Sequence, residues 1–395
     1  MAQLAIDGGR PTRAAMLNYA HQWIDNEDIE AVVNVLKGDW LTTGPKVQAF
    51  ENAVADYTGA KYAVAVNTGT AALHGAVYSS GIGPGDEVIV PPLTFVASAN
   101  CALYVGAKPV FADIDSRTLN IDPKEAEKKI TSRTKAIVAV DLCGQPCDHD
   151  ELRRLAKQYD LSIIEDASHA LGGTYCGRKV GTLQDITTLS FHPVKQITTG
   201  EGGMVLLNDE QKAEKIRSFR HHGIDIDFHK RGQSNLWLYD VVNLGFNYRI
   251  TDISCALGIS QLRKLDGWLE RRRSIVEQYN KAFSNLSGIE TPFVDPRCES
   301  AWHLYVIKLN MDKLSVGREM IFKALRAENI GVNVHYIPIP WLGLYQKLGY
   351  SRGSCPVAEH EYERLITLPL FPAMSEQDVQ DVITAVTKVI QTYQA

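Results

Sequence analysis

Short apolar segments alternate with helical patterns between about residues 47 and 220, and this alternation restricts the possible folds more than any other feature. Runs such as VIV (88–90), IVAV (137–140) and SIIE (162–165) are apolar at successive positions. Strands have this character when helices cover both faces of their sheet. We therefore predict an α/β fold with a mostly parallel central sheet. The predicted strands are Tyr62–Val66, Glu87–Val90, Pro109–Ala112, Ala136–Asp141, Ser162–Glu165, Thr187–Phe191 and Met204–Asn208.

The pattern changes after Asn247. Apolar residues recur at helical spacing from Asp252 to about Leu286, which predicts one long helix. A strand at Leu304–Leu309, a helix at Arg318–Glu328, a strand at Gly331–Tyr336 and a closing helix at Glu376–Thr392 follow. We therefore predict a large domain over residues 1–250, and a linking helix with a smaller α+β domain over residues 251–395.

Composition excludes several classes of protein. With 41 Lys and Arg against 46 Asp and Glu, the chain lacks the basic balance of a nucleic-acid binder. Residues 88–107 carry no charge, but adjacent prolines at 91 and 92 predict a strand, a turn and a helix instead of a membrane span. Seven scattered cysteines and a start without an apolar h-region predict a cytoplasmic protein with reduced thiols.

Four features follow predicted strands at the edge where open α/β sheets bind ligands. The segment Asn67–Thr70 opens a helix, whose first amides and dipole favour a phosphate. Phe95, Asp166 and Lys195 follow three other strands. Taken singly, these features are typical of a helix N-cap, a core aromatic residue, a turn cap and a solvated lysine.

Taken together, the four features match the needs of pyridoxal 5'-phosphate (PLP). This cofactor requires a lysine for a Schiff base, an acidic partner for its ring nitrogen, a phosphate cup and a flat group against its ring. We predict that Lys195 forms the Schiff base and then moves the proton between carbons. Asp166 would keep the ring nitrogen protonated.

Eight ordered segments make the prediction more specific. They resemble the DegT/StrS-type sugar-nucleotide aminotransferases, within the aspartate-aminotransferase (fold type I) PLP enzymes, over nearly the whole chain. The segments are GDWLTTGPKVQAFE, NTGTAALHGA, PPLTFVASANCALYVGAKPVFADID, IIEDASHALGGTYCGRKVG, LSFHPVKQITTGEGGMV, LGFNYRITDISCALGISQL, AWHLYVI and LPLFP.

The resemblance implies roles for matching residues. Lys195 would hold the cofactor, Asp166 would pair with the ring nitrogen, and Phe95 would stack on the ring. His169 would lie near the ring hydroxyl. The implied phosphate ligands are Thr68, Gly69, Thr70 and Ser190, together with Asn247, which would reach the phosphate bound in the other subunit of a homodimer.

The resemblance also implies the substrates, which are L-glutamate as donor and a nucleotide-linked ketosugar as acceptor. Relatives that carry histidine in place of Lys195 are dehydratases, so the lysine favours amino transfer. The run HPVKxITTGEGG, with WLTTGPKV and the stretch at 237–240, resembles the branch of the family that aminates a UDP-4-keto-6-deoxy-N-acetylhexosamine in pseudaminic acid biosynthesis. The alternative acceptor is a UDP-4-keto-pentose, used in aminoarabinose modification of lipid A. Pro340 stands where the favoured branch has a histidine, which leaves acceptor identity open.

Five residues are candidates for substrate binding: His192, Trp237, Tyr239, Arg249 and His335. Arg249 suits a donor carboxylate by its charge, and a buried ion pair within the dimer is an equal alternative. Cys143, Cys147 and His149 lie close in sequence, but no second cluster completes a tetrahedral site, so we predict no metal.

Two other classes of protein fit the sequence less well. A non-catalytic protein on a PLP fold would lose Lys195 or Asp166, and both are present. A nicotinamide-dependent enzyme would carry GxGxxG after its first strand, and the sequence lacks it there.

Overall fold

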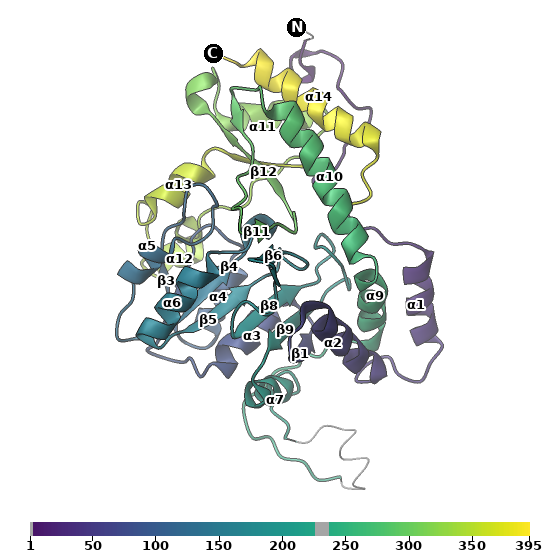
Figure 1. Cartoon of the computed structure of the whole chain (residues 1–395), viewed down its shortest axis with the longest axis vertical. Coiled ribbons are helices and arrows are strands. Elements are labelled where there is room, and N and C mark those ends of the chain that lie inside the picture. The colour runs from purple at the N-terminus through teal and green to yellow at the C-terminus, as the bar shows by residue number, and fades with distance from the viewer. Residues whose placement is uncertain (1–2, 226–236) are drawn as a thin grey trace.

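A seven-stranded sheet lies at the centre of the computed structural model, which describes residues 3–225 and 237–395 (Figure 1). The strand order is β1-β9-β8-β5-β4-β2-β3. Every pairing from β8 to β3 is parallel, whereas β9 runs antiparallel to both of its neighbours. The α/β fold with a mostly parallel sheet is therefore confirmed, and each of the seven strands predicted for residues 47–220 lies within two residues of an observed one. The strands are β1 (Tyr62–Val66), β2 (Glu87–Val90), β3 (Lys108–Phe111), β4 (Thr134–Val140), β5 (Ser162–Asp166), β8 (Ile186–Ser190) and β9 (Gly203–Leu207).

Helices surround this sheet, and most begin and end at residues that suit those positions. Pro45 opens α2 and Gly59 ends it in a left-handed conformation that only glycine adopts without strain. Central strands such as β2 and β9 are buried at every position because helices cover both faces. The helices of this part of the chain are α1 (Asn26–Leu36), α2 (Pro45–Thr58), α3 (Gly69–Ser79), α4 (Ala97–Tyr104), α5 (Pro123–Lys128), α6 (His149–Tyr159), α7 (Glu210–Phe219) and α9 (Asp252–Leu262).

A second hydrophobic core lies at the end of the molecule where both chain termini are found (Figure 1). It forms between a three-stranded sheet, β10-β12-β13, and the helices α10, α11 and α14. Leu4 and Leu17 of the N-terminal segment pack into this second core. The remaining elements are β6 (Thr174–Tyr175), β7 (Arg178–Lys179), β10 (Ile289–Glu290), β11 (Cys298–Glu299), β12 (Tyr305–Leu309), β13 (Leu365–Leu368), α10 (Leu265–Phe283), α11 (Arg318–Ala327), α12 (Gly343–Lys347), α13 (Pro356–Tyr362) and α14 (Glu376–Thr392).

The predicted single helix from Asp252 to Leu286 is wrong. It is two helices, α9 and α10, separated at residues 263–264. Lys264 lies at the break and its ammonium pairs with Asp25 at 2.6 Å and with the buried Asp28 at 2.9 Å. The apolar spacing continues across the break, so hydrophobic periodicity did not reveal it.

The predicted strand at Gly331–Tyr336 is also wrong. This segment makes only a single bridge, between Asn333 and Thr367, and β13 takes the place beside β12 instead. Gly331 donates to the carbonyl of Leu17 at 2.7 Å, so its backbone pairs with the N-terminal segment and not with a sheet. None of the helices in the described ranges is both long and apolar enough to cross a membrane.

Candidate active site

The predicted cofactor residues come from strands whose carboxyl ends meet at one edge of the sheet. Asp166 ends β5, Ser190 ends β8, and Thr68 follows β1. The strands β5 and β8 are parallel neighbours, and β1 runs in the same direction because it is separated from β8 by the antiparallel β9. The topology therefore brings together residues that are far apart in sequence.

The start of α3 presents free backbone amides. The Thr68 hydroxyl accepts from the amide of Ala71 at 3.0 Å, and its carbonyl accepts from Ala72 at 3.1 Å. The two amides before these, at Gly69 and Thr70, have no partner within the helix because they belong to its first turn. A Cβ on Gly69 would lie 2.8 Å from the Cβ of Ser190, so glycine lets α3 begin directly against Ser190. Two amides and a hydroxyl converge there, which is an arrangement that fits a phosphate.

Asp166 is buried and held by donors on both of its oxygens. Ser98 donates to one oxygen at 2.6 Å, while the hydroxyl and amide of Ser168 donate to the other at 2.6 and 3.2 Å. These bonds orient the carboxylate. Sequence reasoning missed Ser98 and Ser168, although Ser168 stands two residues after the predicted aspartate, where such turns are common.

Lys195 lies in the loop between β8 and β9, and its amide donates to the carbonyl of His192 at 2.9 Å. Burial lowers the pKa of Lys195 to about 8, against the opposing effect of the Asp166 charge. A sizeable fraction of its amine is therefore neutral near pH 7 to 8, and a neutral amine can act as a nucleophile and a base.

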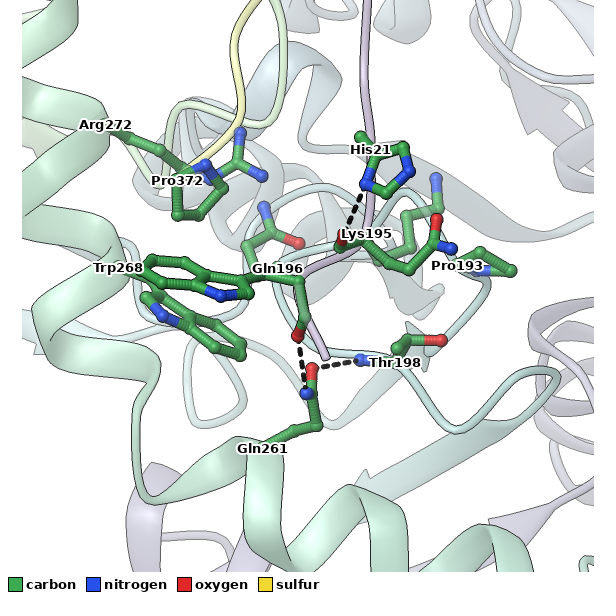
Figure 2. Close-up of a pocket in the computed structure, with 11 residues that line it drawn as sticks. His21, Pro193, Lys195, Gln196, Thr198, Gln261, Trp268, Arg272 and Pro372 are labelled. Atoms are coloured by element: carbon green, nitrogen blue, oxygen red, sulfur yellow. Dashed lines mark hydrogen bonds between the residues drawn. The ribbon is translucent and has the colours of Figure 1, made fainter. Parts of the chain in front are cut away.

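The N-terminal segment braces the loop that carries Lys195. Figure 2 shows His21 beside this loop, and a cavity of about 10 Å³ remains between them and Trp268. Gln261 of α9 connects the two parts: its carbonyl oxygen accepts from the amide of Thr198 at 3.4 Å, and its amide donates to the carbonyl of Trp23 at 2.9 Å. The lysine loop is thus fixed from outside the sheet.

A set of rings surrounds His169. The Nδ1 atom of His169 accepts from the backbone amide of Cys143 at 3.3 Å, so its hydrogen is on Nε2, 3.3 Å from the hydroxyl of Tyr336. The ring centroid of His303 is 4.3 Å away. Burial lowers the pKa of His169 well below its usual range, so the ring is a neutral hydrogen-bond donor.

Phe95 lies near this set, with its ring centroid 6.0 Å from that of Tyr336 and 56% of its surface exposed. An exposed ring at this edge is available to stack on a flat group. Tyr336 was missed as a site residue because it lies in the segment that we predicted to be a strand.

The five candidate substrate residues lie in different places. His335 is buried. Its Nδ1 lies 2.8 Å from the hydroxyl of Thr367, and its Nε2 lies 3.4 Å from the side-chain amide nitrogen of Asn333. Because an amide nitrogen only donates, Nε2 accepts and the ring is neutral. Burial, followed by the charge of Lys195, lowers the pKa of His335 to about 4. His192 is exposed, three residues before the lysine.

Arg249 lies in a separate groove of about 890 Å³, where its guanidinium is 2.9 Å from Nδ1 of His221. The described residues that line this groove do not include Lys195. Trp237 and Tyr239 are 81% and 55% exposed, on the segment beyond α7 that extends from the body of the molecule (Figure 1). Within one chain, the structure therefore does not bring these three residues to Lys195.

Asn247 is exposed, and its carbonyl oxygen is 3.5 Å from the side-chain amide of Asn67, which precedes the phosphate cup of the same chain.

The fold and this site define a PLP-dependent aminotransferase. Residues 22–387 match the model of the DegT/DnrJ/EryC1/StrS aminotransferase family, and the chain belongs to that family. It is a PLP-dependent sugar aminotransferase.

Two curated relatives cover nearly the whole chain. The spore coat polysaccharide biosynthesis protein SpsC of Bacillus subtilis is 45% identical over 382 residues, which are 96% of this chain and 98% of SpsC. The UDP-4-amino-4,6-dideoxy-N-acetyl-beta-L-altrosamine transaminase of Campylobacter jejuni is 40% identical over 368 residues, 92% of this chain and 95% of that protein.

Solved structures share the fold over similar lengths. Spr1654 from Streptococcus pneumoniae, in its PMP form, has a TM-score of 0.91 at 34% identity and covers 95% of this chain and 99% of its own. Helicobacter pylori PseC, an aminotransferase of pseudoaminic acid biosynthesis, has a TM-score of 0.89 at 34% identity, covering 96% of this chain and 100% of its own.

Proposed function

We propose that this protein transfers an amino group from L-glutamate to the C4 ketone of a UDP-linked 4-keto-6-deoxy-N-acetylhexosamine, the reaction of the pseudaminic acid branch. The observation that carries amino transfer is the grouping of Lys195, Asp166 and the free amides of Gly69 and Thr70 at one sheet edge. The acceptor rests on the sequence around Lys195 and on the printed activity of the Campylobacter jejuni relative.

In this proposal, each residue of the candidate site has a defined task. The bound cofactor supplies a ring that accepts electrons from the carbon being deprotonated. The Nζ amine of Lys195 would take up and release the proton, since its lowered pKa lets it gain and lose a proton near neutral pH. Asp166, held by Ser98 and Ser168, keeps the ring nitrogen protonated.

Binding and orientation fall to the surrounding groups. The Gly69 and Thr70 amides and the Ser190 hydroxyl hold the phosphate, and Phe95 covers one face of the ring. His169 donates from Nε2 toward the ring hydroxyl, and Tyr336 lies within reach of the same proton. Together these residues would hold the cofactor beside Lys195.

The sequence differs from that of the favoured branch at Pro340. This residue is buried in a short 3₁₀ turn, Ile339–Trp341, whose first amide donates to the carbonyl of Pro92 at 2.9 Å. A proline here has no side-chain donor for a sugar hydroxyl, so any such contact must come from other residues. A UDP-4-keto-pentose is the alternative acceptor.

We infer that the active unit is a homodimer. Trp237, Leu244 and Phe95 are large apolar side chains that are 81%, 83% and 56% exposed, and a partner subunit would cover such side chains. In a dimer, the segment that carries Trp237 and Tyr239 would reach the partner's site, and Asn247 would contact the partner's phosphate.

A spectral experiment tests the proposal. The holoenzyme is converted to its amino form with glutamate, excess donor is removed, and each UDP-ketosugar is added in turn. Return of the lysine-bound visible band with the 6-deoxy-N-acetyl-4-ketohexose alone supports the proposal. Return with the ketopentose alone moves the assignment to aminoarabinose synthesis, and failure of glutamate to convert the enzyme rejects the donor.

A further inference from the structure

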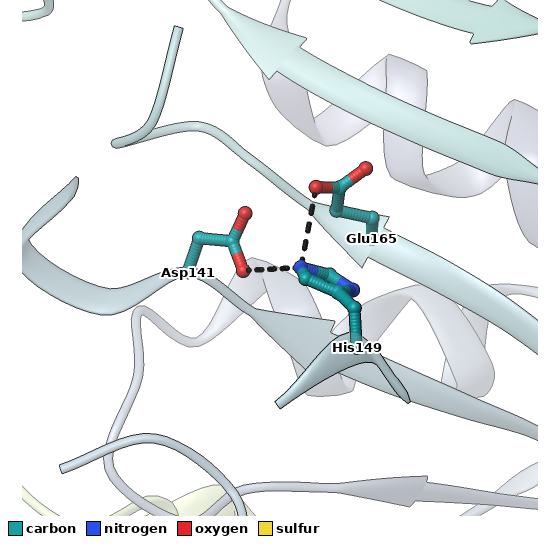
Figure 3. Close-up of side chains that lie close together, drawn as sticks. All are labelled: Asp141, His149 and Glu165. Carbon is teal, nitrogen blue, oxygen red and sulfur yellow. Dashed lines mark ion pairs between the residues drawn. The ribbon is translucent and has the colours of Figure 1, made fainter. Parts of the chain in front are cut away.

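Three titratable side chains, those of Asp141, His149 and Glu165, meet inside the protein (Figure 3). Asp141 follows β4, His149 begins α6, and Glu165 is in β5 directly before Asp166. All three are fully buried. Nε2 of His149 lies 3.3 Å from an oxygen of Asp141 and 3.5 Å from an oxygen of Glu165. We refer to these residues as the Asp141–His149–Glu165 cluster.

The cluster contains three buried atoms without a hydrogen-bond partner among the described residues: Oδ2 of Asp141, Nε2 of His149 and Oε1 of Glu165. Within the same ranges, neither carboxyl forms an ion pair with a lysine or an arginine. Two buried carboxylates without compensation would cost far more than folding can supply. Either a metal ion or protons must therefore neutralise the cluster.

The ligand spacing resembles that of a metal site, because bonds of about 2.0–2.1 Å in a tetrahedron place ligand atoms about 3.3 Å apart. The tautomer of His149 argues against a metal. The side-chain nitrogen of Gln184 is 2.9 Å from Nδ1 and 3.3 Å from the carbonyl oxygen of His149. A carbonyl oxygen only accepts, so its contact identifies the Gln184 atom as the amide nitrogen, which donates. Nδ1 of His149 therefore accepts from Gln184, and Nε2 of His149 carries the hydrogen. A metal would need the lone pair of Nε2.

One proton on the carboxyl pair resolves the arrangement. Glu165, protonated at Oε1, can donate to Asp141, while the Nε2 hydrogen of His149 points between the two carboxyls. The Cys147 amide donates to Asp141 at 2.9 Å and the Thr187 hydroxyl donates to the other oxygen of Glu165, so both groups are otherwise satisfied. Burial raises the pKa of Asp141 to about 7 and that of Glu165 to about 8, which agrees with one bound proton at neutral pH.

The cluster is joined to Asp166 in two ways. Glu165 and Asp166 are consecutive in β5, so their side chains lie on opposite faces of the sheet. The amide of Asp141 donates to the carbonyl of Asp166 at 3.1 Å. The charge of Asp166 also adds to the effect of burial in raising the pKa of Asp141. Such coupling is reciprocal, so a charge on Asp141 acts on Asp166 and on what it binds.

We propose that the Asp141–His149–Glu165 cluster holds one proton and one negative charge, and that Asp141, which bears this charge, is a positioning residue that helps Asp166 keep a cationic ring nitrogen. This inference rests on the proposed role of Asp166. Other titratable groups that face the cluster are Cys147, Asp148, Asp150 and Arg153 around α6, Tyr175 of β6, Cys298 of β11 and Asp166 itself.

The bound proton is tested without cofactor, on the full-length apo-protein. The infrared spectrum at pH 7 is expected to contain the carbonyl stretch of a buried, protonated carboxyl group. Glu165→Gln should remove this band, because the amide replaces the protonated acid. The matched control is Glu361→Gln, since Glu361 is also buried but pairs with Lys308 at 3.2 Å and with Arg364 at 3.1 Å, and this substitution should leave the band in place. Absence of the band in the wild type overturns the proposal.

The charge is tested on the holoenzyme by following its visible spectrum against pH. Asp141→Asn removes the negative charge. It should lower, by about one pH unit, the pH at which half of the bound cofactor has lost the proton of its cationic form, a value expected for charges several ångströms apart in a protein interior. Glu165→Gln should leave the midpoint unchanged. Equal shifts in both variants, or no shift in Asp141→Asn, overturn the proposal.

Elemental analysis provides the third outcome. One equivalent of zinc in the purified wild type, lost in both carboxyl variants, would make the cluster a metal site and overturn the proton model. The proposed role of Asp166 is tested by a separate variant. If Asp166→Asn binds PLP with an unaltered spectrum and midpoint, the proposed function of Asp166 is wrong, whatever the infrared band of Glu165 shows.

Discussion

Replacing Gly69 with alanine tests the phosphate cup most directly. The new Cβ would lie 2.8 Å from the Cβ of Ser190 and 3.0 Å from its hydroxyl oxygen. Ordinary contact begins near 3.4 Å, so α3 and the end of β8 must separate by about 0.6 Å. The nearest atom is the Cβ of Ser190, which is bonded directly to the backbone, so rotation of the side chain cannot relieve this contact.

Two opposing effects set the magnitude. Alanine in place of glycine stabilises a helix by up to about 1 kcal/mol. Overpacking of a buried contact costs about 1–3 kcal/mol, so the net change in stability is small, about 0–2 kcal/mol of destabilisation. The phosphate is affected more, because the Gly69 and Thr70 amides move with the helix. Losing one charge-assisted hydrogen bond costs about 1.5–3 kcal/mol, which predicts a 10- to 100-fold higher Kd for PLP.

The assay is titration of the apo-protein with PLP, followed by absorbance, with thermal unfolding measured in parallel. Gly267→Ala is the matched control, because Gly267 is exposed in α10 and a Cβ there meets nothing within 4 Å. The control should raise Tm slightly and leave the Kd for PLP unchanged. A Gly69→Ala protein with unchanged Kd would refute the placement of the phosphate at α3.

Three further predictions follow from the structure. Lys195→Ala should abolish turnover and the lysine-bound visible band. In the wild-type apo-protein, the lowered pKa of Lys195 means that the unfolded state binds more protons than the folded state between about pH 8 and 10.5, so the free energy of unfolding relative to Lys195→Met should rise over this range. A constant difference in urea midpoints over the same range would contradict the burial of the amine. Lys264→Met should destabilise the protein by about 3 kcal/mol in urea unfolding, because it removes the cation paired with Oδ1 of the buried Asp28, while Oδ2 keeps the Gln261 side-chain amide and the Asp25 backbone amide. Lys323→Met, which breaks an exposed pair with Glu319, should change little, and equal effects would show that the buried pair of Lys264 and Asp28 does not stabilise the fold. Mixing Lys195→Ala with Asn247→Ala protein should restore activity if Asn247 acts on the partner's phosphate, and activity no greater than the sum of the separate proteins would confine Asn247 to its own chain.

Much of the fold was predictable because the signals are local. The apolar runs at 137–140 and 162–165 predict buried strands whatever surrounds them. The capping box of Asp25 and Asp28 at α1 was equally readable, though we did not use it. Lys195 and Asp166 were predictable because each follows a strand at the edge where such sheets bind ligands.

The partners of these residues were not predictable in the same way. Ser98, Tyr336 and His303 each come from a different part of the chain, and none has a local pattern that distinguishes it from a core or turn residue. At the break between α9 and α10, Lys264 pairs with Asp28, more than 200 residues earlier in the sequence, and helical periodicity does not record such a contact.

Sequence order alone therefore predicted the seven strands of the central sheet, most of the helices around it, and the lysine and aspartate that we propose for catalysis. Tertiary structure decided which groups surround them, because hydrophobic periodicity records whether a residue is buried and not what it is buried against. His149 illustrates the difference. Its spacing from Cys143 and Cys147 resembled a metal motif, yet the sheet turns its ring toward Asp141 and Glu165. The protonation that we propose for that cluster depends on burial and on the Gln184 side-chain amide, and both exist only in the folded chain.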